Sequence, residues 1–230
     1  MCGRYASSRS AHDLASHFDV EEPVEQVLAP SWNVAPTAPI YGVLQRGEVR
    51  SLQVLRWGLV PSWSTDVKGA ARLINARRET VQTKPAFRAA YARRRCLLPA
   101  DGYYEWQVDG GRKQPYYLTS RDGSPLAMAG LFEVWSPPDG EPLWTATILT
   151  TAAADELGHV HDRTPLLVFP QDWSRWLDQT LADPGEGLLV PGTPGVLDAW
   201  AVGPAVGNVR VNGPELVAPL APEGPAATLF

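Results

Sequence analysis

The sequence predicts an α+β fold in which mainly antiparallel strands form a barrel-like, twisted sheet core with a few peripheral helices. Strand-like segments dominate the chain, and turn sequences such as VDGGRK, SRDGS and SPPDGE separate them. Asp-Gly and Gly-Gly favour the tight turns that join antiparallel strands. Only short helical patterns lie between these segments. We therefore expect meandering strands that curl into a barrel-like core, with the helices around it.

The strand segments are recognised by runs of β-branched, aromatic and aliphatic residues bounded by turn sequences. In order along the chain they are residues 39–45, 49–60, 94–108, 114–120, 125–135, 144–152, 165–170 and 199–211. The helical patterns are shorter, and one of them has Pro85 in its first turn, where a missing N–H is tolerated. The expected helices are residues 10–18, 75–82, 85–94, 154–160 and 171–179.

Length and composition are typical of one globular domain. The chain has 230 residues, of which 44% are hydrophobic and 20% charged, enough to bury one substantial core. We expect a single domain over residues 1–230, with a loose tail from about residue 219. No charged start precedes an apolar h-region, and no apolar stretch approaches the roughly 18 residues of a membrane span. The expectation is a cytoplasmic monomer that does not contact membranes.

Metal and cofactor sites are not expected. Cys2 and Cys96 are far apart and form no CxxC pair, and the four histidines lack a ligand spacing. No glycine-rich phosphate loop occurs. Cys96 lies in the strand-like stretch RRCLLPA, which favours the interpretation of a small buried hydrophobic residue.

Charge is unevenly distributed along the chain. The net charge is −5, yet residues 68–95 contain nine basic residues and one acid, Glu79. The overall charge argues against a bulk electrostatic surface for nucleic acid, whereas a basic segment on an acidic protein suggests a local anionic ligand. A solvated helical face would explain the same segment, and charge alone leaves both interpretations open.

Cys2 directly follows the initiator methionine in MCGRY. A start methionine is normally trimmed when residue 2 is small, and its removal here would leave a free α-amine and a free thiol on one carbon skeleton. This 1,2-aminothiol is a distinctive nucleophile. A cysteine at a frayed terminus could equally have no role, and only the rest of the chain can decide between the two interpretations.

Six stretches are unusual for a surface or a core: MCGRY, SWNVAPT, RWGLVPSW, LINARRET, DGYYEW and HVHDRTP. In order and spacing they resemble the SOS-response-associated peptidase family, whose members protect abasic sites in single-stranded DNA by cross-linking to them. The resemblance runs from Met1 through PAVGNVRVNGPELVAPL, nearly the full chain. It implies single-stranded DNA with abasic sites as the partner, including sites at single-strand/double-strand junctions, and a nucleoid-associated location when the protein is bound to DNA.

The resemblance assigns the cross-link to Cys2, and the chemistry of the residue agrees. An abasic deoxyribose opens to an aldehyde, and an α-amine with a pKa of about 7.7 to 8.0 is partly unprotonated at neutral pH. A Schiff base alone is reversible and invites β-elimination, which cuts the strand. The neighbouring thiol can instead add to the imine and close a five-membered thiazolidine, a step favoured by proximity.

Three further residues complete the catalytic set that the resemblance implies. Glu105, among the aromatic residues of DGYYEW, would have a raised pKa and move protons during carbinolamine and imine formation; a hydrogen-bonded structural carboxylate is the alternative. His161 would protonate the ring oxygen of the closed sugar. His159 competes for this role, but the family pattern His-x-Arg-x-Pro falls on His161. Asn75 would orient the sugar or the terminal amine.

A second set of residues is expected to contact DNA. Trp63 would stack on a base beside the lesion, a contact worth about 1 to 3 kcal/mol. Asn33 and Pro36 belong to a loop that the resemblance places beside Cys2, where Asn33 would hold the terminal segment by hydrogen bonds. Arg78 is interpreted as a solvated residue. Phosphate contacts position a strand without reading its sequence, and the candidates for them are Arg4, Arg77, Arg88, Arg163 and Arg210.

Two other functions remain open at this point. Cys2 could be the nucleophile of an N-terminal-cysteine peptidase or amidohydrolase, with the α-amine or His161 as base. In a passive single-stranded DNA-binding module, the basic segment and exposed aromatic side chains would bind the strand and Cys2 would be irrelevant. The cross-linking interpretation instead predicts covalent trapping of DNA, with lyase-like chemistry and a peptidase step no larger than removal of Met1.

Overall fold

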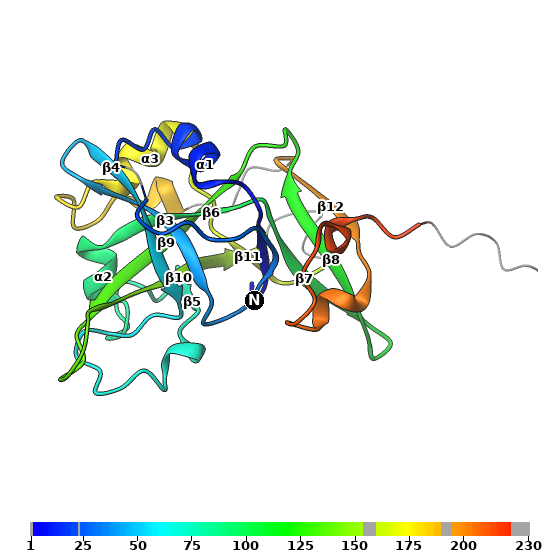
Figure 1. The fold of residues 1–230 in the computed structure, drawn as a ribbon, viewed down its shortest axis with the longest axis horizontal. Helices are drawn as coiled ribbons and strands as arrows, with labels where there is room; N and C mark the ends of the chain where they lie inside the picture. Colours follow the sequence, from blue (N-terminus) through cyan, green and yellow to red (C-terminus); the bar gives the residue numbers. More distant parts are fainter. Residues whose placement is uncertain (1, 23, 154–159, 190–194, 222–230) are drawn as a thin grey trace, which may run out of the picture.

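The computed structural model describes residues 2–22, 24–153, 160–189 and 195–221, and its strands form two sheets (Figure 1). The first sheet has five strands in the order β12-β8-β7-β1-β2, and all its pairings are antiparallel. Its strands are β1 (Tyr5–Ser7), β2 (Ser31–Val34), β7 (Gly102–Asp109), β8 (Arg112–Ser120) and β12 (Leu197–Ala201).

The second sheet has seven strands and curls into a barrel-like core. Its pairings run from β11 through β10, β4, β3 and β6 to β9, and β9 also pairs with β10, so that they follow a ring. The β3–β6 link is the single register pair Val43–Leu97, so the barrel is not strictly closed. Its strands are β3 (Pro39–Arg46), β4 (Val49–Trp57), β5 (Asn75–Arg77), β6 (Arg95–Ala100), β9 (Leu126–Trp135), β10 (Leu143–Ala152) and β11 (Arg163–Pro165).

Helices are short and lie outside the sheets. The hydroxyl of Ser10 accepts the Asp13 N–H at 3.1 Å and so caps the start of the first helix. Phe18, at the end of that helix, packs on Trp173 at the start of the last α-helix, with ring centroids 4.7 Å apart. The α-helices of the described residues are α1 (Ala11–His17), α2 (Arg88–Arg93) and α3 (Trp173–Leu177). The 3₁₀ turns are η1 (Ala70–Arg72), η3 (Pro170–Asp172), η4 (Glu186–Leu189), η5 (Pro204–Gly207) and η6 (Pro214–Val217).

The predicted fold class is confirmed: antiparallel strands dominate and helices are few. The segment 94–108, predicted as one strand, is divided at Asp101, so that β6 and β7 lie in different sheets. The Asp101 carboxylate accepts the N–H and hydroxyl of Ser8 at 2.6 and 2.7 Å and fixes this corner. Gly102 follows because a Cβ there would lie 2.5 Å from the carbonyl oxygen of Leu118. This division carries β7 away from the barrel and creates the junction described below.

Three predicted elements are wrong. Residues 199–211 do not form a continuous strand, since β12 ends at Ala201 and the turn η5 begins at Pro204, which has no N–H to donate to a neighbouring strand. Residues 75–82 do not form a helix: residues 75–77 are β5, which pairs in parallel with β10, and residues 78–83 form turns. Pairing with a buried strand outweighs the helical pattern of this segment. Residues 165–170 do not form a continuous strand, since β11 ends at Pro165 and only an isolated bridge at Leu167 follows. The predicted helix over residues 154–160 falls almost entirely outside the described residues.

The short strands β1 and β2 were not predicted, because three or four residues carry too little periodicity. At the other end, Pro219 bridges to Val202 and the Leu220 N–H donates to Ala201. The chain is therefore still hydrogen-bonded where the sequence predicts that a loose tail begins. In the part of the chain that the structure describes, no helix is long and apolar enough to cross a membrane.

Candidate functional site

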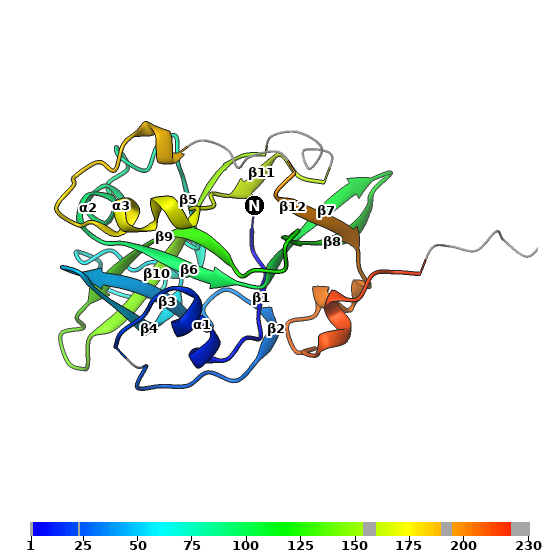
Figure 2. The ribbon, with the colours of Figure 1, turned by 90° about the horizontal axis from the view of Figure 1, so that it is seen from above.

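Cys2 precedes β1 and packs in a hydrophobic cluster to which both sheets contribute, and the amino-terminal end of the chain is marked between the two sheets in Figures 1 and 2. β1 pairs with both β2 and β7, and the backbone N–H of Tyr104 donates to the carbonyl of Arg4 at 2.9 Å. Cys2 is fully buried, and its thiol lies 3.9 Å from the same carbonyl oxygen. Cys2 is thus held in the interior, unlike a cysteine of a frayed terminus.

Asn75 brings an amide from the second sheet to Cys2. It is the first residue of β5, and its register partner on β10 is Ile148. Its Nδ2 donates to the carbonyl of Cys2 at 2.7 Å. Its buried Oδ1 has no hydrogen-bond partner among the described residues. This oxygen can therefore accept a hydrogen bond from a group brought next to Cys2.

Glu105 and His161 approach each other from the two sides of the junction. Glu105 lies on β7 and is buried, whereas His161 lies just ahead of β11 with 28% of its side chain exposed. The Nε2 atom of His161 is 4.0 Å from Oε2 of Glu105. The backbone N–H of Arg163 donates to Nδ1 of His161 at 2.9 Å, and the same nitrogen lies 2.9 Å from Oδ1 of Asp162.

Burial sets the protonation states of this group. It raises the pKa of Glu105 to about 7, with a smaller contribution from the charge of Asp162. It raises the pKa of the Cys2 thiol, and the negative charge of Glu105 adds to this effect. It lowers the pKa of His161. At neutral pH the site therefore contains a thiol, a neutral imidazole and a carboxyl group that is poised between its two forms.

Arg163 joins the turns after β5 to β11. Its guanidinium donates to both carboxylate oxygens of Glu79, at 2.7 and 3.0 Å, and to the carbonyl of Thr150 at 2.7 Å. Its side chain is 13% exposed. The geometry is that of a bidentate ion pair that fixes the backbone beside His161.

Arg4 and Asn33 form a second internal network. Nη1 of Arg4 donates to Oδ1 of Asn33 and to the carbonyl of Val206, both at 2.7 Å. Nδ2 of Asn33 donates to the carbonyls of Asn208 and Val211 at 3.0 and 2.7 Å. Asn33 lies in β2 rather than in the expected loop, where it accepts a hydrogen bond from Arg4 of the amino-terminal segment and ties it to the segment 206–211. Pro36 follows in the turn between β2 and β3, where it is half-buried.

The remaining candidates for DNA contact are exposed and lie on separate elements. Trp63 is 68% exposed, in a loop after β4 that is anchored where the indole N–H of Trp135 donates to the carbonyl of Ser64 at 2.7 Å. The other exposed candidates are Arg77 at the end of β5, Arg88 at the start of α2 and Arg210 between η5 and η6. Among these four residues, Arg77 shares an element with the cluster, since Asn75 is the first residue of β5.

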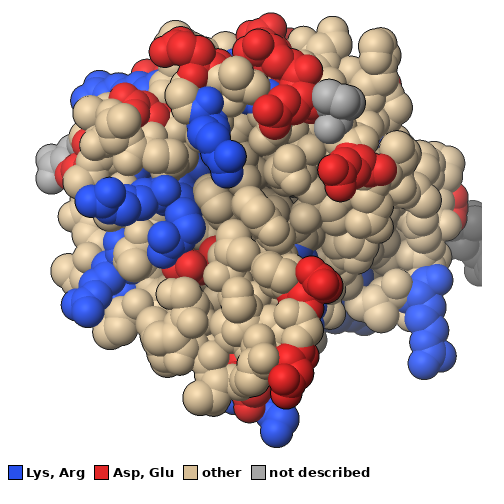
Figure 3. Space-filling model, turned by 60° about the vertical axis from the view of Figure 1, so that its left-hand side comes forward, with Lys and Arg blue, Asp and Glu red and all other residues tan. Residues whose placement is uncertain are grey.

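The basic segment 68–95 contains both buried and exposed basic side chains. Arg95 is fully buried and donates to backbone carbonyls in segments 91–92 and 176–181, and Arg94 pairs with Glu133 at 2.6 Å. These two arginines are structural. Others in the segment remain exposed, and Figure 3 shows Lys and Arg side chains gathered in one part of the face on which α2 lies, with acids along its upper edge.

Sequence patterns missed two groups beside the site, Glu79 and Thr150, which hold Arg163. They are separated from Arg163 by 84 and 13 residues, and no local pattern links residues that are paired only in the folded chain. His159, the alternative to His161, lies outside the described residues. Among the residues that are described, no group of three or more His, Cys, Asp or Glu side chains is placed to hold a metal ion.

A buried amino-terminal cysteine, an amide, a carboxyl group and an imidazole at the junction of two sheets define the class of protein. The chain belongs to the SOS response associated peptidase (SRAP) family, whose profile matches residues 1–209. This confirms the family indicated by the six motifs.

Named relatives cover almost the whole chain. The abasic site processing protein YoqW of Bacillus subtilis (strain 168) is 36% identical over 221 residues, 94% of this chain and 99% of that protein. The abasic site processing protein YedK of Escherichia coli (strain K12) is 32% identical, over 96% of this chain and all of that protein. HMCES of Gallus gallus is 30% identical, over 96% of this chain and 78% of that protein. A crystal structure of a protein from Bacteroides thetaiotaomicron has a TM-score of 0.87 at 25% identity, with 96% of this chain and 100% of that chain covered.

Proposed function

We propose that this protein senses and shields abasic sites in single-stranded DNA by forming a covalent cross-link through Cys2. The observation that carries the proposal is the placement of Cys2: buried, held through its carbonyl by Asn75, and electrostatically coupled to Glu105. The names of the curated relatives support abasic sites as the target.

The cross-link forms in three steps after Met1 is removed. The α-amine of Cys2 attacks C1′ of the opened sugar, and a carbinolamine forms. Loss of one water gives the imine. The thiol then adds across the C=N bond: the sulfur bonds to C1′, the S–H proton passes to nitrogen, and a thiazolidine closes. No oxidant, metal or cofactor is needed, and the only leaving group is water.

Glu105 moves the protons of these steps. With a pKa of about 7 it is present in both forms at neutral pH, so it can donate the proton that expels water from the carbinolamine and accept the proton of the thiol. Burial raises the pKa of that thiol, and a nearby base is therefore required for sulfur to attack. Oδ1 of Asn75 accepts a hydrogen bond from the amine and orients it.

His161 serves the step before the cross-link. A natural abasic sugar is overwhelmingly closed, and its opening requires a proton at the ring oxygen. His161 lies at the edge of the buried cluster, partly exposed, and delivers that proton. Its lowered pKa makes the protonated ring a strong acid for this purpose.

The exposed residues position the strand. Arg77 continues the strand that carries Asn75, so a phosphate bound to its guanidinium would lie next to the lesion. Trp63 stacks on a neighbouring base, and Arg88 and Arg210 contact phosphates farther along. Arg4, Asn33, Pro36 and Arg163 shape the binding surface, since their polar groups or backbone positions support the walls of the site. The protein acts as a monomer, at single-strand regions including junctions with duplex.

Two side activities accompany this chemistry. When the imine forms and the ring does not close, β-elimination cuts the strand, a lyase-like outcome. The peptidase of the family's description corresponds to removal of Met1, by the protein itself or by an aminopeptidase. A bacterial protein with this function would be cytoplasmic and nucleoid-associated while bound to DNA.

The test is incubation with a single-stranded oligonucleotide that carries one abasic site, followed by heating and denaturing electrophoresis. A heat-stable protein–DNA band is expected. The same oligonucleotide with a tetrahydrofuran in place of the abasic sugar has no aldehyde and should give none. Bands of equal intensity with the two oligonucleotides would contradict the proposal. The absence of a band with the abasic oligonucleotide would contradict it as well.

A further inference from the structure

A hydrogen bond between Tyr103 and Thr164 joins the two sheets beside the site. The hydroxyl oxygens lie 2.9 Å apart, and Oγ1 of Thr164 is also 3.4 Å from the carbonyl oxygen of Pro165. A carbonyl only accepts, so both contacts are satisfied when Tyr103 donates to Thr164 and Thr164 donates to Pro165. Tyr103 lies on β7 of the first sheet, and Thr164 lies on β11 of the second.

The same two segments carry Glu105 and His161. Tyr103 and Glu105 are two residues apart on β7, so their side chains leave the same face of the strand. Thr164 follows Arg163, whose backbone N–H binds the ring of His161. Tyr103, Glu105, His161 and Thr164 all line one cavity of about 10 Å³, room for about one water molecule. Two contacts therefore cross the same gap: the 2.9 Å bond of Tyr103 to Thr164 and the 4.0 Å approach of His161 to Glu105.

Side-chain packing joins the two sheets around Tyr103, but no backbone pairing sets the width of this gap in the described residues. In the described chain, β7 pairs with β1 and β8 and β11 pairs with β10, so no backbone ladder links β7 to β11. Tyr103 is 1% exposed, and its hydroxyl would lose its partner if the two strands separated. Because an unsatisfied buried hydroxyl is costly, the bond resists that separation.

We propose that the Tyr103–Thr164 hydrogen bond is a positioning device that holds Glu105 and His161 at their working separation. The two hydroxyls bond to each other and to the carbonyl of Pro165, so the role assigned to them is positioning rather than proton transfer. The inference rests on the proposed function for its consequence in cross-linking, but the 4.0 Å approach of His161 to Glu105 is present without DNA and can be probed alone.

The first test is the rate of cross-linking to a natural abasic site. Thr164→Val and Tyr103→Phe each remove one hydroxyl with little change of shape, and each should slow the reaction about 10-fold, as expected for a misplacement below 1 Å. The double variant should be no slower than the slower single variant, because both remove the same bond. Thr164→Ser keeps the hydroxyl and should react within about twofold of the wild type.

Tyr104→Phe is the matched control. Tyr104 is the next residue on β7, and its hydroxyl donates to the carbonyl of Trp32 at 2.7 Å on the opposite face of the strand. Its loss removes an equally buried tyrosine hydroxyl bond from the same strand but not the link across the gap. Three results would overturn the positioning role. Tyr104→Phe could slow the reaction as much as Tyr103→Phe, the effects of the two single variants could multiply in the double variant, or Thr164→Ser could be as slow as Thr164→Val.

The second test needs no DNA. The titration midpoint of the His161 ring is followed by NMR, with and without Glu105→Gln, and the shift caused by that substitution measures how strongly the two groups interact. In a Thr164→Val background this shift should fall to less than about half its wild-type size, and in Tyr104→Phe it should stay the same. An unchanged shift in Thr164→Val overturns the inference even if cross-linking is slow. If the wild type forms no adduct, the proposed function fails, and this measurement still decides whether the bond positions the pair.

Discussion

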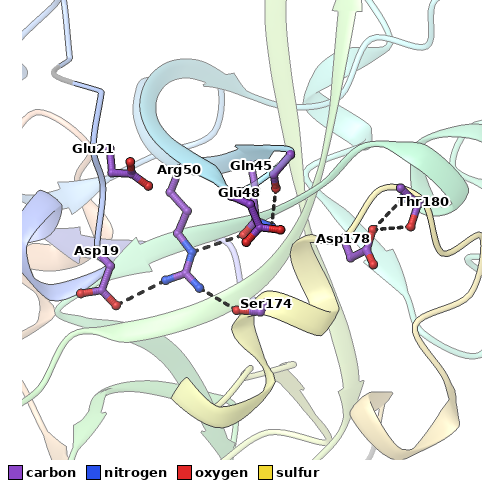
Figure 4. A pocket seen from close by; sticks show the side chains of 9 residues that line it. Asp19, Glu21, Gln45, Glu48, Arg50, Ser174, Asp178 and Thr180 are labelled. Carbon is purple, nitrogen blue, oxygen red and sulfur yellow. Dashed lines mark hydrogen bonds and ion pairs between the residues drawn. The ribbon is translucent and has the colours of Figure 1, made fainter.

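The cluster around Cys2 and the cleft between the β3–β4 hairpin and α3 differ in size, exposure and charge. The cleft measures about 580 Å³, and acidic side chains surround Arg50 in it (Figure 4). The cavity beside Glu105 measures about 10 Å³. The larger hollow holds the more visible set of charges, yet the smaller one is lined by Glu105, whose pKa is raised by burial to about 7, and by His161, whose pKa is lowered by burial.

The difference lies in how each charge is stabilised. In the cleft, Arg50 donates to the carbonyl of Phe18 at 3.0 Å and to the hydroxyl of Ser174 at 2.9 Å, with Asp19 at 3.5 Å. Neighbouring carboxylates are open to water or bound by local hydroxyls, as Asp178 is by Thr180. Glu105 is instead buried on β7, a strand that also carries the buried aromatic side chains of Tyr103 and Tyr104. The pKa of a carboxyl group in these two regions therefore follows its desolvation and its hydrogen bonds rather than the size of the cavity.

Substitutions in the two regions should differ most in their effect on the heat-stable adduct. Cys2→Ala removes the thiol and should abolish the heat-stable adduct, while its α-amine still forms the imine and nicks DNA. Glu48→Gln, in the cleft, should leave the adduct unchanged. Gel assays of both variants on one abasic oligonucleotide make the comparison, and an undiminished stable adduct in Cys2→Ala would contradict the mechanism.

Substitutions of His161 and Glu105 should affect different steps of the proposed reaction. His161→Ala should slow cross-linking to a natural abasic site by about 10²- to 10⁴-fold, the usual contribution of a proton donor. It should react far more normally with an oligonucleotide bearing a preformed aldehyde. Glu105→Ala should slow both substrates, because imine formation needs proton transfers after opening. Equal impairment of His161→Ala on both substrates would falsify the ring-opening role.

Stability against pH tests the desolvation of Glu105. Its pKa is raised from 4.5 to about 7 on folding, so the folded protein binds more protons than the unfolded chain between those values. The contribution of Glu105 to the free energy of unfolding should therefore fall as pH rises from about 4.5 to 7 and then level off. Glu105→Gln should be more stable than the wild type at pH 8 by up to about 3 kcal/mol, and not at pH 4.

Urea unfolding of both proteins at pH 4 and pH 8 makes this measurement. Glu48→Gln, in the exposed cleft, is the control and should differ from the wild type by less than about 0.5 kcal/mol at either pH. A wild type whose stability rises between pH 5 and 7 relative to Glu105→Gln would show that the carboxylate is stabilised rather than penalised.

The smallest expected effect concerns two adjacent arginines. Arg77 is exposed, and Arg78 is half-buried in the turn that follows. Arg77→Ala should weaken single-strand binding about 5- to 10-fold and lower the slope of log affinity against log salt by about one. Arg78→Ala should do much less. Equal losses in fluorescence-anisotropy titrations would show that the two side chains were assigned to the wrong sides of the strand.

The sequence revealed the strands with long apolar runs, and it indicated the family through motifs that stand far apart. It could not reveal that Asp101 breaks one long strand into β6 and β7, because the hydrogen bonds from Ser8 come from 93 residues away. Nor could it predict β5, since the pairing of Asn75 with Ile148 depends on a strand 73 residues later. Arg4 and Arg163 were expected to face DNA, yet their guanidinium groups bind Asn33 and Glu79. Charge type is visible in a sequence, whereas the partner of a charge is set by the fold.

The intact mass of the adduct, measured after denaturation and thiol alkylation, tests directly whether Cys2 forms a thiazolidine with the abasic site. The chain has two cysteines, Cys2 and Cys96. The expected species lacks Met1, and its mass equals that of protein plus oligonucleotide minus one water. It takes up one alkyl group, on Cys96, because the sulfur of Cys2 is in the ring. An adduct that retains Met1, or one that takes up two alkyl groups, would contradict the thiazolidine.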